Sequence, residues 1–202
     1  MKQLMVLVTL LAFSGCGSSE ASKPPVATKV AEVESQPKDM LVGTALVGSG
    51  NEIAHVDVLI GPKSGPVGIA FARAVADQKK GYSNFIASIR PDIALKPSTV
   101  IVPKVAVETA EQSVQLYGAV QLGVAKGVAD AVLELGIDEH RAEDLVIVCS
   151  VLVHWEAVDK SQLLQNNYNA TRKAVTRAFS NEPQLRAVLE AAKGLSTDEY
   201  PK

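Results

Sequence analysis

The sequence is poor in cysteine, in aromatic residues and in excess charge, and each shortage excludes a class of function. Its two cysteines, Cys16 and Cys149, are too few for a disulfide framework or for a zinc site made of cysteines alone. Aromatic residues are 4% of the 202 residues, which leaves no obvious platform for stacking nucleobases. Because 20 Lys and Arg nearly balance 22 Asp and Glu, we also expect no nucleic-acid partner.

Hydrophobic residues, in contrast, are plentiful. They make up 47% of the chain against 21% charged residues, a composition that supports a packed core and excludes wholesale disorder. The length allows one domain of ordinary size, or at most two small ones.

The first 16 residues resemble a bacterial lipoprotein signal. A short basic start at 1–3 precedes an apolar run at 4–13, which is too short to cross a bilayer because a span needs roughly 20 residues. Ser14 and Gly15 then precede Cys16, which in such signals is lipidated and becomes the new N-terminus. The alternatives are an ordinary cleaved signal peptide and a misassigned start codon.

These features predict a chain of four parts. We expect a signal peptide at 1–15, a disordered tether at 16–39, a folded domain at 40–183, and a helix or tail at 184–202. The tether is rich in Ser, Ala, Lys, Glu and Pro, so it cannot bury enough surface to offset the entropy of ordering. A lipid on Cys16 would anchor the protein to a membrane outside the cytoplasm, on the periplasmic or outer-membrane side. If the signal is not used, the protein stays in the cytoplasm.

The folded part is predicted to mix strands and helices in an α+β sandwich. Strands are expected at 41–47, 53–60, 84–90, 99–107 and 144–153, and helices at 67–78, 108–135 and 161–179. The first two strands should form a hairpin, and the apolar run at 144–153 should be a buried central strand. This order of elements favours an α+β fold over a dinucleotide-binding one.

Several finer expectations concern single residues. Pro103 suggests an edge position or a bulge in its strand. Gly118 and Gly123 are placed to split the helix at 108–135, and Gly136 is placed to end it. The charged stretch around His140 indicates a solvated loop, and Cys149 is most simply a small core residue.

The histidines offer the best candidates for chemistry. His55 and Asp57 stand two residues apart on a predicted strand, as do His154 and Glu156, so each pair should point to one side of its strand. Two such pairs facing each other could bind a metal ion, although nothing in the spacing brings them together. Alternatively, a carboxylate can orient a histidine for acid–base catalysis, or His55 can be a packed strand residue.

Several segments together resemble the formaldehyde-activating enzyme family. The likeness spans about 41–183 and rests on the segments 42–48, 50–57, 60–62, 96–97, 154–156 and 167–171. It implies the condensation of formaldehyde with tetrahydromethanopterin to methylene-tetrahydromethanopterin and water, without a metal. Tetrahydromethanopterin is then a co-substrate, and no cofactor is tightly bound. The resemblance also implies a fold similar to the second domain of ribosomal protein S5, and a ring of five subunits with the pterin between neighbours.

The resemblance assigns roles to five residues of the domain. His55 matches the family's proposed general acid, and Asp57 matches a carboxylate that contacts the pterin. The other pterin contacts are Ile86, Lys104 and Gln121. The hydroxyl of a hemiaminal leaves poorly unless it is protonated, and a histidine, with an ordinary pKa of about 6.5, suits that task.

Two positions depart from the family's pattern. Ala106 stands where a threonine is usual, and Leu122 replaces a commonly polar residue beside Gln121. The pterin is moreover a cytoplasmic coenzyme, whereas a lipoprotein lies outside the cytoplasm. The alternative function is therefore a non-catalytic or repurposed pterin- or aldehyde-binding module on a membrane-anchored lipoprotein, and a weaker one is a structural ring protein.

Overall fold

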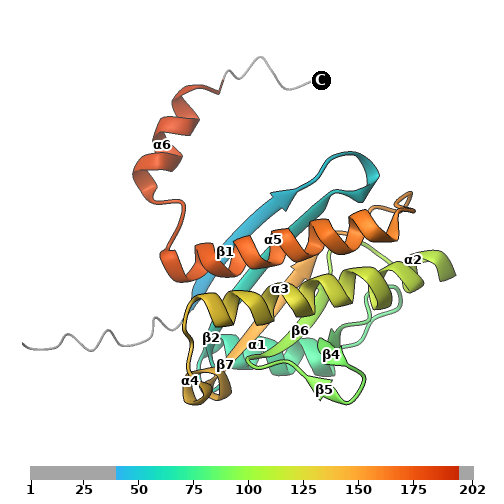
Figure 1. The fold of residues 1–202 in the computed structure, drawn as a ribbon, viewed down its shortest axis with the longest axis horizontal. Helices are drawn as coiled ribbons and strands as arrows, with labels where there is room; N and C mark the ends of the chain where they lie inside the picture. The colour runs from blue at the N-terminus through green and yellow to red at the C-terminus, as the bar shows by residue number, and fades with distance from the viewer. Residues whose placement is uncertain (1–39, 196–202) are drawn as a thin grey trace, which may run out of the picture. The chain divides into compact units, whose positions relative to one another are not determined.

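The computed structural model describes residues 40–195. The signal peptide, tether and lipidated Cys16 predicted from the sequence lie outside the described residues. At the centre is a mixed five-stranded sheet in the order β1 (Leu41–Val47), β2 (Ala54–Pro62), β7 (Leu145–Val151), β6 (Ser98–Pro103) and β3 (Phe85–Ile86) (Figure 1). Strands β6 and β7 are parallel and the other neighbours are antiparallel. A small second sheet pairs β4 (Ser88–Arg90) with β5 (Ile93–Ala94).

The predicted hairpin of the first two strands is confirmed. Its turn contains a short 3-10 helix, η1 (Gly50–Glu52), and both Gly48 and Gly50 have positive φ angles, of 86° and 66°. Glycine adopts such angles without the steric cost that a side chain would impose. The resulting register places Thr44 opposite Asp57 and Leu46 opposite His55.

One face of the sheet is covered by two long helices, α3 (Gln121–Glu134) and α5 (Lys160–Ser180) (Figure 1). Glycines allow the close packing of this layer, since an added Cβ at Gly43 of β1 would lie 2.0 Å from the carbonyl oxygen of Ala174. The main core lies between this helical layer and the sheet, and its largest fully buried members there are Ile60, Ile101, Leu116, Ile147 and Leu163.

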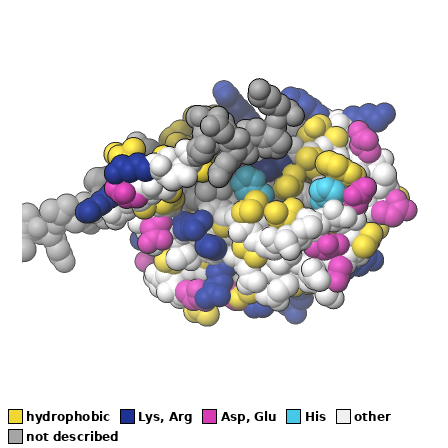
Figure 2. Space-filling view, turned by 90° about the horizontal axis from the view of Figure 1, so that it is seen from above, with side chains coloured by type: hydrophobic (Ala, Val, Ile, Leu, Met, Phe, Trp, Pro, Cys, Tyr) yellow, Lys and Arg dark blue, Asp and Glu magenta, His cyan; other side chains and the backbone are white. Residues whose placement is uncertain are grey.

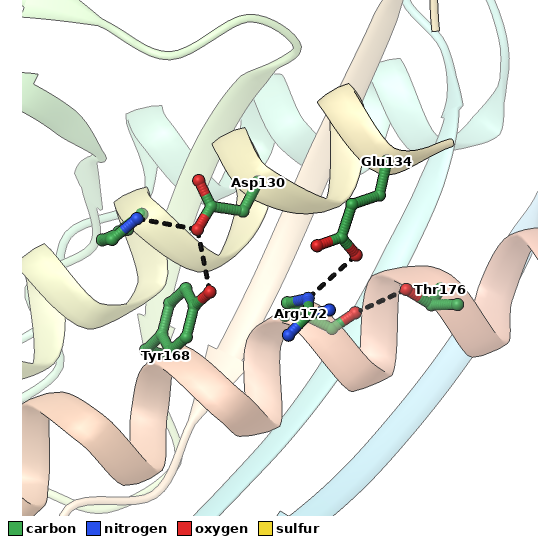
Figure 3. A network of polar contacts seen from close by, with 6 residues as sticks. Asp130, Glu134, Tyr168, Arg172 and Thr176 are labelled. Carbon is green, nitrogen blue, oxygen red and sulfur yellow. Dashed lines mark hydrogen bonds and ion pairs between the residues drawn. The ribbon is translucent and has the colours of Figure 1, made fainter. Parts of the chain in front are cut away.

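Polar side chains join α3 to α5 at the outer surface of the layer (Figure 3). The carboxylate of Asp130 accepts hydrogen bonds from Lys126, at 2.7 Å, and from the hydroxyl of Tyr168, at 2.8 Å. One turn further along, Arg172 donates to Glu134 at 2.8 Å. The contacts with Lys126 and Tyr168 lower the pKa of Asp130.

Within residues 40–195, the opposite face of the sheet is only partly covered. Helix α1 (Pro66–Ala76) packs there against β2, β7 and β6, behind the sheet in Figure 1. It begins at Pro66, whose fixed φ suits a first helical turn. The predicted α+β class is thus confirmed, with part of the second sheet face left open.

Two strand predictions differ from the structure. The strand expected at 84–90 is divided into β3 and β4, which belong to different sheets. Strand β6 is an inner strand that ends at Pro103, so the expected edge position is wrong. The proline is tolerated because β3 is short and pairs only with Val100 and Ile101 of β6. Within the described chain, no strand therefore lies beside Pro103 on that edge to accept the backbone hydrogen bond that proline cannot donate.

The long predicted helix is divided by a π-helical turn instead of a break. Helix α2 (Ala110–Gln115) leads into the π-helix η2 (Leu116–Val120) and then into α3. The stretch Ala110–Glu134 is long and apolar enough to span a membrane, but half of its most apolar window is buried inside the fold, as in a core helix. Gly136 follows α3 with a φ of 61° and ends the helix as predicted.

Two further helices complete the described chain. His140 lies on the short helix α4 (Glu139–Asp144), and not in the loop expected there, because Asp138 caps the helix by accepting the N–H of Arg141. The last helix, α6 (Leu185–Lys193), contains no buried residue.

Candidate active site

The candidate site lies on the open face of the sheet. Along β2, residues alternate between burial under α5 and partial exposure on the other face, which carries His55 and Asp57. Histidine side chains reach the surface among hydrophobic ones in Figure 2. The alternation predicted from the sequence therefore places both members of this pair on one accessible face.

Three charged or titratable side chains meet there. The Nε2 atom of His55 lies 3.4 Å from Asp57 Oδ1, and Asp57 Oδ2 lies 2.6 Å from the Nζ atom of Lys104, which follows the end of β6. Their side chains are 40%, 41% and 19% exposed, respectively. His55 is thus open to a ligand, while the ammonium of Lys104 is shielded from solvent beside Asp57.

The electrostatics of the cluster favour an ionised Asp57. Partial burial alone would raise the pKa of its carboxyl, but the contact with Lys104, a hydrogen bond from Thr44 and the positive charge of Lys104 outweigh burial and hold the pKa below the ordinary value of an aspartate. Asp57 therefore carries a negative charge at neutral pH. It can accept hydrogen bonds from N–H groups of a ligand and from the ring of His55.

Cys149 lies in the interior and not in the site. It is fully buried on β7, and burial raises the pKa of its thiol to about 12. A thiol with such a pKa stays protonated at neutral pH and is a poor nucleophile. The structure agrees with its interpretation as a core residue.

The remaining predicted contacts form a second group at the far side of the sheet. Ile86 lies on β3 and is partly exposed, and Gln121 begins α3 and donates through Nε2 to the carbonyl of Ser88 at 2.7 Å. Strands β7 and β6 separate β2 from β3. Neighbouring strands lie about 4.8 Å apart, so the strands that carry His55 and Ile86 are about 14 Å apart.

The second histidine–carboxylate pair does not form as expected. His154 and Glu156 lie in a turn after β7, where the backbone N–H of Glu156 donates to His154 Nδ1 at 3.2 Å. The strand alternation assumed for them therefore does not apply. Within residues 40–195, no group of three or more His, Cys, Asp or Glu side chains is arranged to hold a metal ion.

One neighbour of the site was not found from the sequence. The hydroxyl of Thr44, on the adjacent strand, lies 3.4 Å from His55 Nε2. In the turn after β7, Trp155 stacks on His154 with ring centroids 4.2 Å apart and is 65% exposed. The pairing register of the hairpin would have placed Thr44 beside His55. That register depends on the length of the turn, which the glycines alone do not predict.

Comparison with known proteins points to one family. Residues 42–198 match the family model described as formaldehyde-activating enzyme (Fae). Relatives named bifunctional enzyme Fae/Hps include one from Methanocella arvoryzae, 47% identical over 147 residues, which cover 73% of this chain and 37% of the relative. Another, from Methanothrix thermoacetophila, is 48% identical over 149 residues, which cover 74% of this chain and 38% of the relative.

A relative from Archaeoglobus fulgidus with the same name is 45% identical over 148 residues, covering 73% of this chain and 38% of its own length. The matched part thus spans less than two fifths of each of these curated relatives.

Proposed function

Because the chain belongs to the formaldehyde-activating enzyme family, we propose that it condenses formaldehyde with tetrahydromethanopterin to methylene-tetrahydromethanopterin and water. The observation that carries this proposal is the cluster of His55, Asp57 and Lys104 on an open sheet face. It combines a proton donor with a fixed negative charge, which are the groups that this condensation needs.

The reaction requires one assisted proton transfer. A secondary amine of the pterin attacks the carbonyl carbon of formaldehyde, and the nitrogen's proton passes to the oxygen, which gives a hemiaminal. In our proposal His55 then protonates the hydroxyl, the C–O bond breaks, and water leaves as an iminium forms. The second amine attacks the iminium carbon and closes the ring by losing its proton. Such acid catalysis is typically worth roughly 10²–10⁴-fold in rate.

We propose that Asp57 and Lys104 act as a binding pair. The ionised carboxylate can accept hydrogen bonds from the pterin, and Lys104 keeps it ionised. Asp57 Oδ1 also lies 3.4 Å from His55 Nε2, close enough to orient the ring. The pterin enters as a co-substrate, with no tightly bound cofactor.

We propose further that the pterin site is shared between copies of this chain. Ile86 and Gln121 lie across the sheet from His55, a separation that a neighbouring subunit could bridge. Val42 and Leu46 of edge strand β1 are 54% and 57% exposed, and Leu46 lies opposite His55. Large apolar side chains exposed around a site are typical of a surface that a partner covers. The family resemblance favours a pentamer.

The proposed general acid can be tested by replacing His55. We expect His55→Ala to slow the catalysed condensation by roughly 10²-fold or more, with a much smaller change in pterin affinity. His140→Ala is the matched control, because that histidine is exposed on α4, remote in sequence from the cluster. A folded His55→Ala protein with the wild-type catalysed rate would exclude the assignment.

We also propose that the protein is a membrane-anchored lipoprotein outside the cytoplasm. The support is the sequence at 4–16, with its apolar run and Cys16. This location separates the protein from a cytoplasmic pterin pool, which favours the alternative function of a module that binds a different pterin. The replacement of a usual threonine by Ala106 is consistent with such a change.

A further inference from the structure

Glu52, which the site described above does not include, connects two segments that flank His55. It is the last residue of η1, and β2 begins two residues later. Its Oε1 atom accepts the backbone N–H groups of Val158 and Asp159, at 3.1 Å and 3.2 Å. Both hydrogen bonds lower the pKa of Glu52, so the carboxylate is ionised at neutral pH.

The same region is fixed by a second set of contacts. The backbone carbonyl of Glu52 accepts Asn166 Nδ2 of helix α5 at 2.7 Å. Gly48 leaves room for that side chain, since an added Cβ there would lie 2.4 Å from Asn166 Nδ2. Asp159 in turn caps α5 by accepting the N–H groups of Ser161 and Gln162. The turn between β1 and β2 is therefore attached to the start of α5.

His55 also contacts the segment that Glu52 holds. Its backbone carbonyl accepts the N–H of Leu152, at 3.1 Å, where the chain leaves β7. From Leu152 the chain runs through His154 and Trp155 to the two N–H groups that Glu52 holds. The segment 152–159 is thus held at both ends, by His55 of β2 at one end and by Glu52, just before β2, at the other.

We infer that Glu52 is a positioning residue, whose carboxylate holds the segment 152–159 against the start of β2 and thereby fixes His55 toward Asp57. The kinetic part of this inference rests on the proposed function. One oxygen atom accepts both N–H groups, so the amide oxygen of Glu52→Gln can make the same contacts, whereas Glu52→Ala cannot. Glu52→Asp keeps the charge but is one methylene too short.

The tie itself is tested without any substrate. Trp155 is the chain's one tryptophan and lies within the tied segment, so its fluorescence reports on that segment. In the full chain, Glu52→Ala should lower the fluorescence anisotropy of Trp155 and speed amide hydrogen exchange at 152–159. Glu52→Gln should resemble the wild type. The control is Glu111→Ala, because that exposed carboxylate on α2 makes no hydrogen bond or ion pair within residues 40–195.

The positioning role is tested by kinetics on the same proteins. Misplacing a catalytic group by about 1 Å can cost roughly 10²-fold in rate, so kcat of Glu52→Ala should fall by about tenfold to 10²-fold, while KM for both substrates stays within about twofold. Glu52→Gln should restore kcat. A lower melting temperature with unchanged kcat would show a structural role only and overturn the inference.

Two other results are informative. If Glu52→Ala does not fold, Glu52→Asp is used in its place. Amide hydrogen exchange at 152–159 and a kcat equal to those of the wild type in that variant would overturn the inference. If the wild type itself shows no catalysed rate, the proposed function fails. In that case the exchange and anisotropy of the Glu52 variants still decide whether the tie exists.

Discussion

At the scale of single residues, the ion pair between Asp57 and Lys104 explains why a charge can persist on this sheet face. Lys104 is mostly buried and lies 2.6 Å from Asp57, so each group stabilises the charge of the other. Removing either partner would leave the other without its counter-charge, which costs more than the pair contributes. Asp57 is partly exposed, so solvent screens some of this interaction.

The pair predicts how stability depends on pH. Because folding lowers the pKa of Asp57, its contribution is present above the unfolded pKa of about 3.9 and is lost as pH falls through the lower, folded pKa. We therefore expect the free energy of unfolding of Asp57→Asn to lie below that of the wild type at pH 7. The difference should shrink below about pH 4. Urea unfolding at several pH values measures it, and a constant difference would contradict the account.

Residue patterns predicted part of the site. Strand alternation was enough to place His55 and Asp57 on one face. The residue pattern alone could not join Lys104 to them, and only the family resemblance did, because the position of Lys104 depends on β7 lying between β2 and β6. The arrangement of strands in a sheet is set by long-range packing, which local patterns do not encode.

At the scale of elements, the close approach of α3 and α5 depends on glycine. An added Cβ at Gly123 would lie 2.6 Å from the carbonyl oxygen of Leu164, which belongs to the backbone and cannot move aside easily. Gly118, in the adjoining π-helical turn, has no atom within 4 Å of such a Cβ. Packing therefore requires glycine at position 123 but not at position 118, although both glycines interrupt the same helical sequence pattern.

This difference predicts opposite effects of one substitution. Gly123→Ala should destabilise the fold by about 1–3 kcal/mol, because overpacking forces the two helices apart. Gly118→Ala should be neutral or stabilising by about 0.5–1 kcal/mol, because alanine favours helix. Thermal or chemical unfolding of both variants gives the comparison. Equal stability of the two variants would show that the helices can separate without cost.

The elements that the sequence predicted well are those with long, regular patterns. The hairpin strands, the central strand β7 and helix α5 begin and end within a few residues of expectation. Strands β3, β4 and β5 contain two or three residues each, too few to show a period. The π-helical turn keeps the chain helical where glycines suggested a break, because Leu116 and Val120 remain buried in the core.

At the scale of the whole molecule, our proposal places a second copy of the chain on the open sheet face. We expect the chain that begins at Met40 to form a homo-oligomer, most simply a pentamer. Its mass by light scattering at micromolar concentration should then be a multiple of the monomer mass. A strictly monomeric mass would exclude a site shared between subunits and would leave Ile86 and Gln121 without a role in the pterin site.

The lipoprotein proposal predicts how the chain is processed. The mature protein should begin at Cys16 and partition with membranes, and Cys16→Ser should release it or leave it unprocessed. Mass spectrometry of the N-terminus, after cell fractionation, measures both. A soluble cytoplasmic chain that retains Met1 would exclude the anchor and would place the protein with a cytoplasmic pterin.

The central claim is that this domain catalyses the condensation of formaldehyde with tetrahydromethanopterin through His55. Its most direct test is the rate of methylene-tetrahydromethanopterin formation with the purified chain lacking residues 1–39, compared with the uncatalysed rate and with the His55→Ala variant. We predict acceleration by the wild type and a rate near the uncatalysed one for the variant. A folded, oligomeric wild type that binds the pterin without accelerating its reaction would contradict the claim and identify a binding module instead.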